Sequence, residues 1–206
     1  MKLIKELQDL RSESSWDRYL RIRTTGRDDS NADDNRYPYE PTPYSVLQRL
    51  AETGMITKRD TLLDYGCGKG RVSFFMAHEA GCRTIGVEIN TRLYEKALKN
   101  RETAVSGMKT AFFRDDAALF TVPEQVNRAF FFNPFSVKVL RPVMDRIRHS
   151  WYNEPREILL FFYFPALEYT GFLMQEETLA FEDEIDTSDL FYENQAREKI
   201  LIFRME

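Results

Sequence analysis

The feature that most constrains the fold is the alternation, from Thr61 onward, of continuous apolar segments with amphipathic ones. Stretches such as A-F-F-F (129–132) and I-L-L-F-F-Y-F (158–164) have no polar face. Strands of this kind are covered on both sides, as parallel sheets flanked by helices require. The pattern therefore predicts an α/β fold in which strands and helices follow one another along the chain.

The expected elements can be placed along the second part of the chain. Strands are expected at residues 61–65, 83–88, 109–114, 128–132 and 157–163, and helices near residues 70–80, 91–105, 136–151 and 165–176. After the last helix, T-L-A-F-E-D-E-I-D and K-I-L-I-F-R-M-E predict two strands with no helix between them. We therefore expect one doubly wound, mostly parallel, seven-stranded sheet with an antiparallel strand pair at its C-terminal edge.

The first 60 residues are expected to form a cap of helices and loops on this core, within a single domain of 206 residues. Residues 3–22 predict an amphipathic helix. The polar stretch 24–36 predicts either a solvated tether or a functional lid.

A proline-rich segment, Y-P-Y-E-P-T-P-Y at 37–44, follows the polar stretch. Its prolines stiffen the chain, and Thr42 or Pro43 is expected to begin a helix that runs to about Glu52. The segment thus predicts a rigid connection into the core.

Composition limits the classes of function. Charged residues make up 30% of the chain and the net charge is -4, which argues against a surface that grips nucleic acid along its whole extent. A local basic patch stays compatible with these numbers. Two cysteines, Cys67 and Cys82, and two histidines are too few for a disulfide framework or a closed zinc site, so no metal is expected.

The N-terminal residues carry charges between their apolar pairs, which is unlike a signal peptide. No apolar run approaches the roughly 20 residues of a membrane span. The sequence thus predicts a cytoplasmic protein without a membrane partner.

A glycine loop, T-L-L-D-Y-G-C-G-K-G-R-V-S at 61–73, joins the first apolar run to a helical one. A dinucleotide fingerprint would need a third glycine where Arg71 stands, and the P-loop pattern is absent. Asp64, at the end of the run, would repel a pyrophosphate but suits a ligand with positive charge. S-adenosylmethionine, which has a sulfonium and an ammonium group and no phosphate, fits this requirement.

The loop resembles that of the class I S-adenosylmethionine-dependent methyltransferases, in which an acid two residues before the first of three alternating glycines ends a strand. The resemblance extends to an acid that ends the second strand, here Glu88 in G-V-E-I-N, and to an aspartate after the third, here in F-F-R-D-D-A. In the family, the acid after the second strand bonds the ribose hydroxyls, and the aspartate after the third strand meets the adenine amino group. For the second role Asp116 is preferred over Asp115. The resemblance implies a cofactor site made of Asp64, Tyr65, Gly66, Gly68, Gly70, Glu88, Ile89, Asp115, Asp116, Ala117 and Asn133.

The fourth expected strand ends in F-F-F-N-P-F, which is similar to the family's [DN]-P-P-[YF] motif with one proline missing. By this resemblance Asn133, Pro134 and Phe135 are the catalytic residues: the Asn133 side chain and the Pro134 carbonyl would orient a substrate amino group, and Phe135 would pack against it. The segment Tyr37–Leu50 is similar to the element before the glycine loop of non-SET lysine methyltransferases. The resemblance thus implies an N-methyltransferase of a small molecule or a protein side chain.

Other interpretations stay open. Taken singly, Asp64 could cap a turn, Glu88 could be a solvated acid, and Asn133 with Pro134 could form an ordinary turn. Their joint place at the ends of successive strands favours a ligand site. The chain could also be a non-catalytic partner subunit that binds the cofactor, a nucleic-acid methyltransferase or an NAD-dependent oxidoreductase, the last disfavoured by Asp64 and Arg71.

Overall fold

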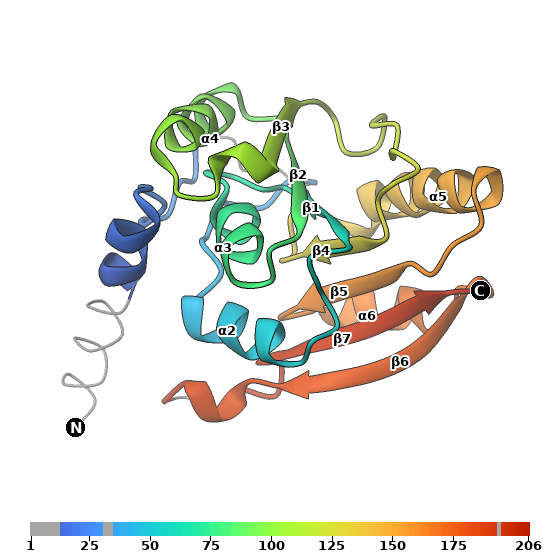
Figure 1. Ribbon diagram of the computed structural model, residues 1–206. Helices are drawn as coiled ribbons and strands as arrows, with labels where there is room; N and C mark the ends of the chain where they lie inside the picture. Colours follow the sequence, from blue (N-terminus) through green and yellow to red (C-terminus); the bar gives the residue numbers. More distant parts are fainter. Residues whose placement is uncertain (1–12, 31–34, 193–194) are drawn as a thin grey trace.

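A seven-stranded sheet forms the centre of the computed structural model, which describes residues 13–30, 35–192 and 195–206 (Figure 1). The strands are β1 (Thr61–Tyr65), β2 (Arg83–Glu88), β3 (Thr110–Arg114), β4 (Arg128–Phe131), β5 (Leu159–Tyr163), β6 (Leu179–Asp186) and β7 (Lys199–Met205). Their order is β3-β2-β1-β4-β5-β7-β6, with β1 to β5 parallel and β7 antiparallel to both β5 and β6. The expected fold class, including its antiparallel edge, is confirmed.

Helices cover both faces of the sheet. They are α2 (Tyr44–Glu52), α3 (Arg71–Glu79), α4 (Thr91–Thr103), α5 (Val137–Asn153) and α6 (Leu167–Leu173), and residues 13–20 are also helical. One core cluster joins Leu63, Phe131 and Phe162 of the sheet to α5 and α6. A second joins Leu62 and Phe161 to α2, α3 and α4 (Figure 1). This double cover explains why the central strands have no polar face.

Several boundaries differ from the expected ones by one to three residues, as fraying ends usually do. Strand β3 begins at Thr110 because Gly107–Lys109 forms a 3₁₀ turn, and β5 begins only at Leu159. Helix α6 ends at Leu173 rather than at residue 176. The N-terminal helix ends before Arg21, whose φ is 58°, and its expected beginning lies outside the described residues. No helix in the described ranges is long and apolar enough to cross a bilayer.

The polar stretch after this helix is not a free tether in its described part, residues 24–30. Thr24 is fully buried, and its amide and hydroxyl both donate to the Asp17 carboxylate at 2.6 Å. The Lys69 ammonium, from the glycine loop, donates to the carbonyls of Thr25 (2.6 Å) and Gly26 (3.0 Å). The N-terminal segment is thereby bound to the loop between β1 and α3.

Candidate functional site

The loop between β1 and α3 turns through three glycines with positive φ: Gly66 (68°), Gly68 (54°) and Gly70 (87°). A Cβ on Gly66 would overlap the Pro134 ring, and one on Gly68 would overlap the Tyr39 ring. Both positions therefore need glycine for conformation and for space. The loop is in this way enclosed by two segments that are distant in sequence.

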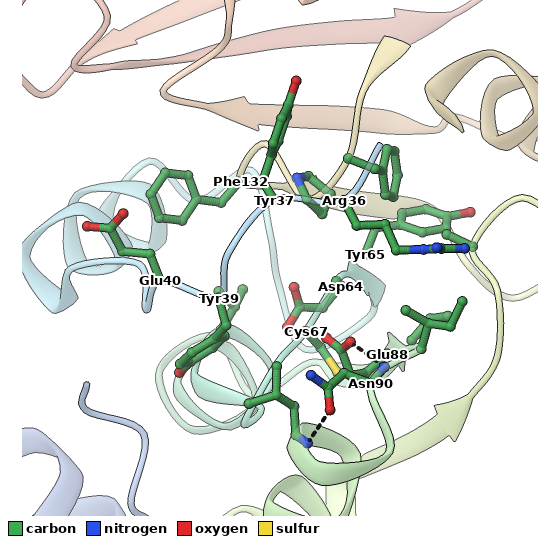
Figure 2. A pocket seen from close by; sticks show the side chains of 18 of the residues that line it. Arg36, Tyr37, Tyr39, Glu40, Asp64, Tyr65, Cys67, Glu88, Asn90 and Phe132 are labelled. Atoms are coloured by element: carbon green, nitrogen blue, oxygen red, sulfur yellow. Dashed lines mark hydrogen bonds between the residues drawn. The ribbon is translucent and has the colours of Figure 1, made fainter. Parts of the chain in front are cut away.

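A pocket lies beside this loop, at the carboxyl ends of the parallel strands, where open α/β sheets bind their ligands (Figure 2). The structure brings these expected site residues to its wall: Asp64, Tyr65, Gly66, Glu88, Ile89, Asp115, Asp116, Ala117, Pro134 and Phe135. It does not place Gly68, Gly70 or Asn133 there: Gly68 lies against Tyr39, Gly70 precedes α3, and Asn133 lines a neighbouring cavity. The pocket encloses about 100 Å³, less than the roughly 300 Å³ at which small-molecule sites usually begin.

Asp64 is a buried carboxyl at the end of β1. It accepts a hydrogen bond from the Ser73 hydroxyl (2.9 Å), and no lysine or arginine of the described ranges forms an ion pair with it. Burial, opposed by the hydrogen bonding from Ser73, raises the pKa of Asp64 to about 7. A buried carboxylate without a cation suits a ligand that brings a positive charge.

Glu88 ends β2, and its side chain is held by two backbone amides. Its carboxylate accepts from the amide of Gly68 (2.9 Å) and from that of Asn90 (2.8 Å). Burial raises the pKa of Glu88, and these amide bonds oppose the shift. The side chain therefore joins the glycine loop to the turn before α4, and its carboxylate lies beside Cys67 and Asp64 in the pocket wall (Figure 2).

Asp116, at the other end of the pocket, follows β3. Its carboxylate accepts from the Ala118 amide (3.0 Å) and pairs with the Arg36 guanidinium at 3.3 Å. The neighbouring Asp115 turns back on the chain, accepting from the Asp116 amide (2.8 Å). Asp116 is thus the one of the two that links the pocket wall to the N-terminal segment.

Residues 35–42, here termed the strap, cover the pocket and were not among the expected site residues. The Tyr37 amide donates to the Pro134 carbonyl (3.3 Å), and the Ser136 amide donates to the Asn35 carbonyl (2.9 Å). The Tyr39 hydroxyl donates to the Thr24 carbonyl (2.7 Å). The proline-rich sequence signalled a stiff segment, but its contact with the glycine loop had no signal in the sequence.

Asn133 follows β4 with a positive φ of 39°, and its side chain is engaged by the loop after β5. Its amide donates to the Phe164 carbonyl, and its side-chain oxygen accepts from the Ala166 amide (3.2 Å). The Pro134 carbonyl, the second expected acceptor of a substrate amine, is bonded to Tyr37. Both expected acceptors thus have a protein donor, and their role in orienting an amine stays a prediction.

A second cavity, of about 590 Å³, adjoins the pocket. The two share Tyr37, Pro38, Glu40, Pro41 and Phe132 in their walls. Figure 2 shows Glu40 and Phe132 on the side of the pocket away from Glu88 and Asn90. The strap therefore separates two neighbouring spaces at the ends of β1, β4 and β5.

The polar groups of the pocket fit S-adenosylmethionine. Asp64 offers a buried carboxylate with no cationic partner in the described ranges, which suits an ammonium or a sulfonium. Glu88 offers acceptors for hydroxyl groups at the end of β2. No cluster of histidine, cysteine or acidic side chains suited to a metal occurs in the described ranges.

Comparison with known proteins agrees with this geometry. Residues 62–151 match the family described as "Methyltransferase domain". A protein-lysine N-methyltransferase of Saccharolobus islandicus is 36% identical over 91 residues, which are 41% of this chain and 56% of that protein. A histone H3 lysine-79 methyltransferase of Dictyostelium discoideum is 45% identical over 56 residues, 27% of this chain and 3% of that protein. The chain thus spans about half the length of the first relative and a small part of the second.

Solved structures share the fold. An RNA methyltransferase from Salinibacter ruber, in complex with S-adenosylhomocysteine, matches with a TM-score of 0.54 at 20% identity, over 81% of this chain and 92% of the other. A TehB-like S-adenosylmethionine-dependent methyltransferase from Corynebacterium glutamicum matches with a TM-score of 0.57 at 17% identity, over 78% and 88%. At these identities the likeness concerns the architecture.

Proposed function

We propose that the chain is a class I S-adenosylmethionine-dependent methyltransferase that transfers a methyl group to the side-chain nitrogen of a lysine in a protein. The match of residues 62–151 to a methyltransferase family and the lysine methyltransferase relative support this proposal. The observation that carries the proposal is the pair of adjoining spaces, a narrow cofactor pocket and a larger cavity beside it. An extended amine that enters the cavity would reach the shared wall at Phe132 without displacing the cofactor.

The proposed binding roles follow from the charges of the pocket. When bound, S-adenosylmethionine supplies a methyl group that its sulfonium makes open to attack by a neutral amine. Asp64 would hold the positive end of the cofactor, since its buried carboxylate has no cation of its own in the described ranges. Glu88 would accept hydrogen bonds from the ribose, and Asp116 would face the adenine end.

The strap would exclude water and fix the direction of approach. Methyl transfer is a displacement that needs the three reacting atoms in line, so positioning supplies much of the catalysis. Asn133 is bonded to the loop after β5, and Pro134 is bonded to the strap. The two residues would thereby fix the wall along which the amine passes. Phe135 would pack behind them against Tyr65.

Lysine is proposed over other acceptors because the relatives with the highest identity quoted above are named as lysine methyltransferases. The resemblance of Tyr37–Leu50 to the corresponding element of non-SET enzymes points the same way, and this segment includes most of the strap. The net charge of -4 also suits a basic protein substrate better than a nucleic acid.

The test combines binding with transfer. Titration with S-adenosylmethionine, S-adenosylhomocysteine and NAD should show binding of the first two alone. Labelled methyl groups should then enter a peptide library containing lysine, but not a matched library with arginine in its place, and hydrolysis should release methyl-lysine. The proposal would be contradicted if the label entered RNA instead. It would also be contradicted if the cofactor bound without transfer to any amine, a result that would favour a non-catalytic subunit.

A further inference from the structure

The second cavity has an aromatic wall of defined geometry. The rings of Phe132 and Tyr163 lie 4.7 Å apart, and the Phe164 ring stands perpendicular to that of Phe132 at 6.4 Å. Their apolar faces suit the methylene groups of an aliphatic side chain, and their π-electrons attract a cation. A flexible aliphatic cation would therefore find favourable contacts along this wall.

Two carboxylates also line the cavity, Glu40 from the strap and Glu198 from the turn before β7. The Tyr163 hydroxyl donates to Oε2 of Glu198 at 2.8 Å, whereas Oε1 has no hydrogen-bond partner among the described residues. Burial raises the pKa of Glu198, opposed by the Tyr163 bond and by Arg197, while the nearby charge of Glu40 adds to the rise. Two like charges around one cavity are stabilised by a cation between them.

The two arginines of the cavity wall are engaged elsewhere. Arg197 donates to the carbonyls of Pro165 (3.1 Å) and Phe164 (3.1 Å), and its guanidinium stacks on the Phe164 ring at 4.2 Å. Arg27 is paired with Asp29 at 2.7 Å. Arg197 thus fixes the Phe164 wall, and neither arginine forms an ion pair with Glu40 or Glu198 in the described ranges.

We infer that this cavity binds the acceptor as a primary alkyl ammonium, with Glu198 and Glu40 contacting the charged end and Phe132, Tyr163 and Phe164 contacting the methylene groups. Before transfer the ammonium gives one proton to either carboxylate, which leaves the nitrogen with a free electron pair for attack on the methyl carbon. The inference rests on the proposed function and adds the residues that select the substrate. Tyr163 acts as a positioning residue, because it holds the carboxylate of Glu198 in one orientation. A neutral side chain of the same length would bring no positive charge to the two carboxylates.

The first experiment measures binding and needs no transfer. The protein saturated with S-adenosylhomocysteine is titrated with n-butylamine, which mimics the lysine side chain, and with n-butanol, which has the same length and no charge. We expect n-butylamine to bind at least about tenfold more tightly. Glu198→Gln and Glu40→Gln should each remove most of this preference, whereas Glu95→Gln, an exposed glutamate on α4, should retain it.

The second experiment compares kinetics on a lysine peptide. Glu198→Gln should raise KM about tenfold with a smaller change in kcat. Glu198→Asp, which keeps the charge, should have a KM between those of the parent and of Glu198→Gln. Both variants should bind S-adenosylhomocysteine within twofold of the parent affinity. If Glu198→Gln does not fold, Glu40→Gln carries both experiments, since the Glu40 side chain is exposed.

The outcomes separate the two proposals. Charge-dependent binding of n-butylamine without methylation of any lysine substrate would overturn the proposed function and support the inference about the cavity. The inference about the cavity would be overturned if lysine were methylated with unchanged KM in both glutamine variants and if n-butylamine and n-butanol bound equally. The proposed function would then still hold.

Discussion

Asn133 and Phe164 follow the neighbouring strands β4 and β5, both have positive φ (39° and 49°), and the side-chain amide of Asn133 donates to the Phe164 carbonyl. Left-handed backbone is unfavourable for residues other than glycine and occurs often at functional sites. The bond from Phe164 N to the Lys199 carbonyl (2.9 Å) and the bond from Ala166 N to Asn133 add further restraint. The two turns therefore form one rigid unit beside the second cavity.

Replacement of Asn133 should separate its conformational role from its chemical one. Asn133→Ala loses both side-chain bonds and keeps an unfavourable φ, so we expect destabilisation of about 1–3 kcal/mol. Asn133→Gly loses the same bonds but tolerates the φ. Both variants should bind S-adenosylhomocysteine nearly as the parent does and lose methyl transfer, measured by titration and by labelled-methyl assay. Turnover at the parent rate in the glycine variant would show that the amide does not orient the amine.

Asp64→Asn should weaken binding of S-adenosylmethionine by roughly ten- to hundredfold, as expected for loss of one charged hydrogen bond. The reason is that the buried carboxylate, which has no cationic partner in the described ranges, would hold the positive end of the cofactor. Isothermal titration gives the affinity. Asp145→Asn, an exposed change on α5, serves as the control, and equal affinities for both variants and the parent would remove Asp64 from the site.

Binding of S-adenosylhomocysteine should depend on pH through Asp64. In the free protein the pKa of this carboxyl is about 7, and a bound ammonium would lower it, so binding releases a proton. Affinity should therefore be full above pH 8 and fall by about tenfold for each pH unit below 7. Titrations between pH 5.5 and 8.5 should show this slope in the parent and a much flatter one in Asp64→Asn. If the affinity fell with the same slope in the parent and in Asp64→Asn, a group other than Asp64 would be titrating. Glu88→Gln would then be the next variant to measure.

Gly68→Ala should displace the strap. The added Cβ would overlap the Tyr39 ring and would sit on a backbone with φ of 54°. We expect at least tenfold weaker cofactor binding and faster proteolytic cleavage within the strap. Gly171→Ala is the matched control, because an added Cβ there would meet no atom within 4 Å outside its own stretch of helix, and alanine favours the helix. Equal rates of cleavage in Gly68→Ala and Gly171→Ala would contradict the contact between Gly68 and the Tyr39 ring.

The fold could be predicted from the sequence to within a few residues because its strands are buried on both faces. The run from Leu159 to Tyr163 is entirely buried between α5–α6 and α2–α3, so its composition alone identified it. The short turn at Gly107–Lys109 had no comparable signal, and its effect on the start of β3 was missed.

Most of the expected residues that reach the pocket wall lie at or shortly after the end of a strand. Asp64 and Glu88 end β1 and β2, so local pattern placed them correctly at the pocket wall. The positions of Tyr39 on Gly68, and of Asn133 against the loop after β5, depend on contacts between segments far apart in sequence. Local pattern carries no information on such contacts. For this reason Asn133 was expected in the pocket, and the N-terminal segment was expected as a cap without any of its residues being named as part of the site.

The strap has a consequence for how two ligands would affect each other's binding. Its residues form part of the wall of both spaces, and the pocket in its present form is narrow. A strap that shifted to admit the proposed cofactor would also reshape the cavity. The two affinities would then be coupled, and each ligand would change the affinity of the other by the same factor.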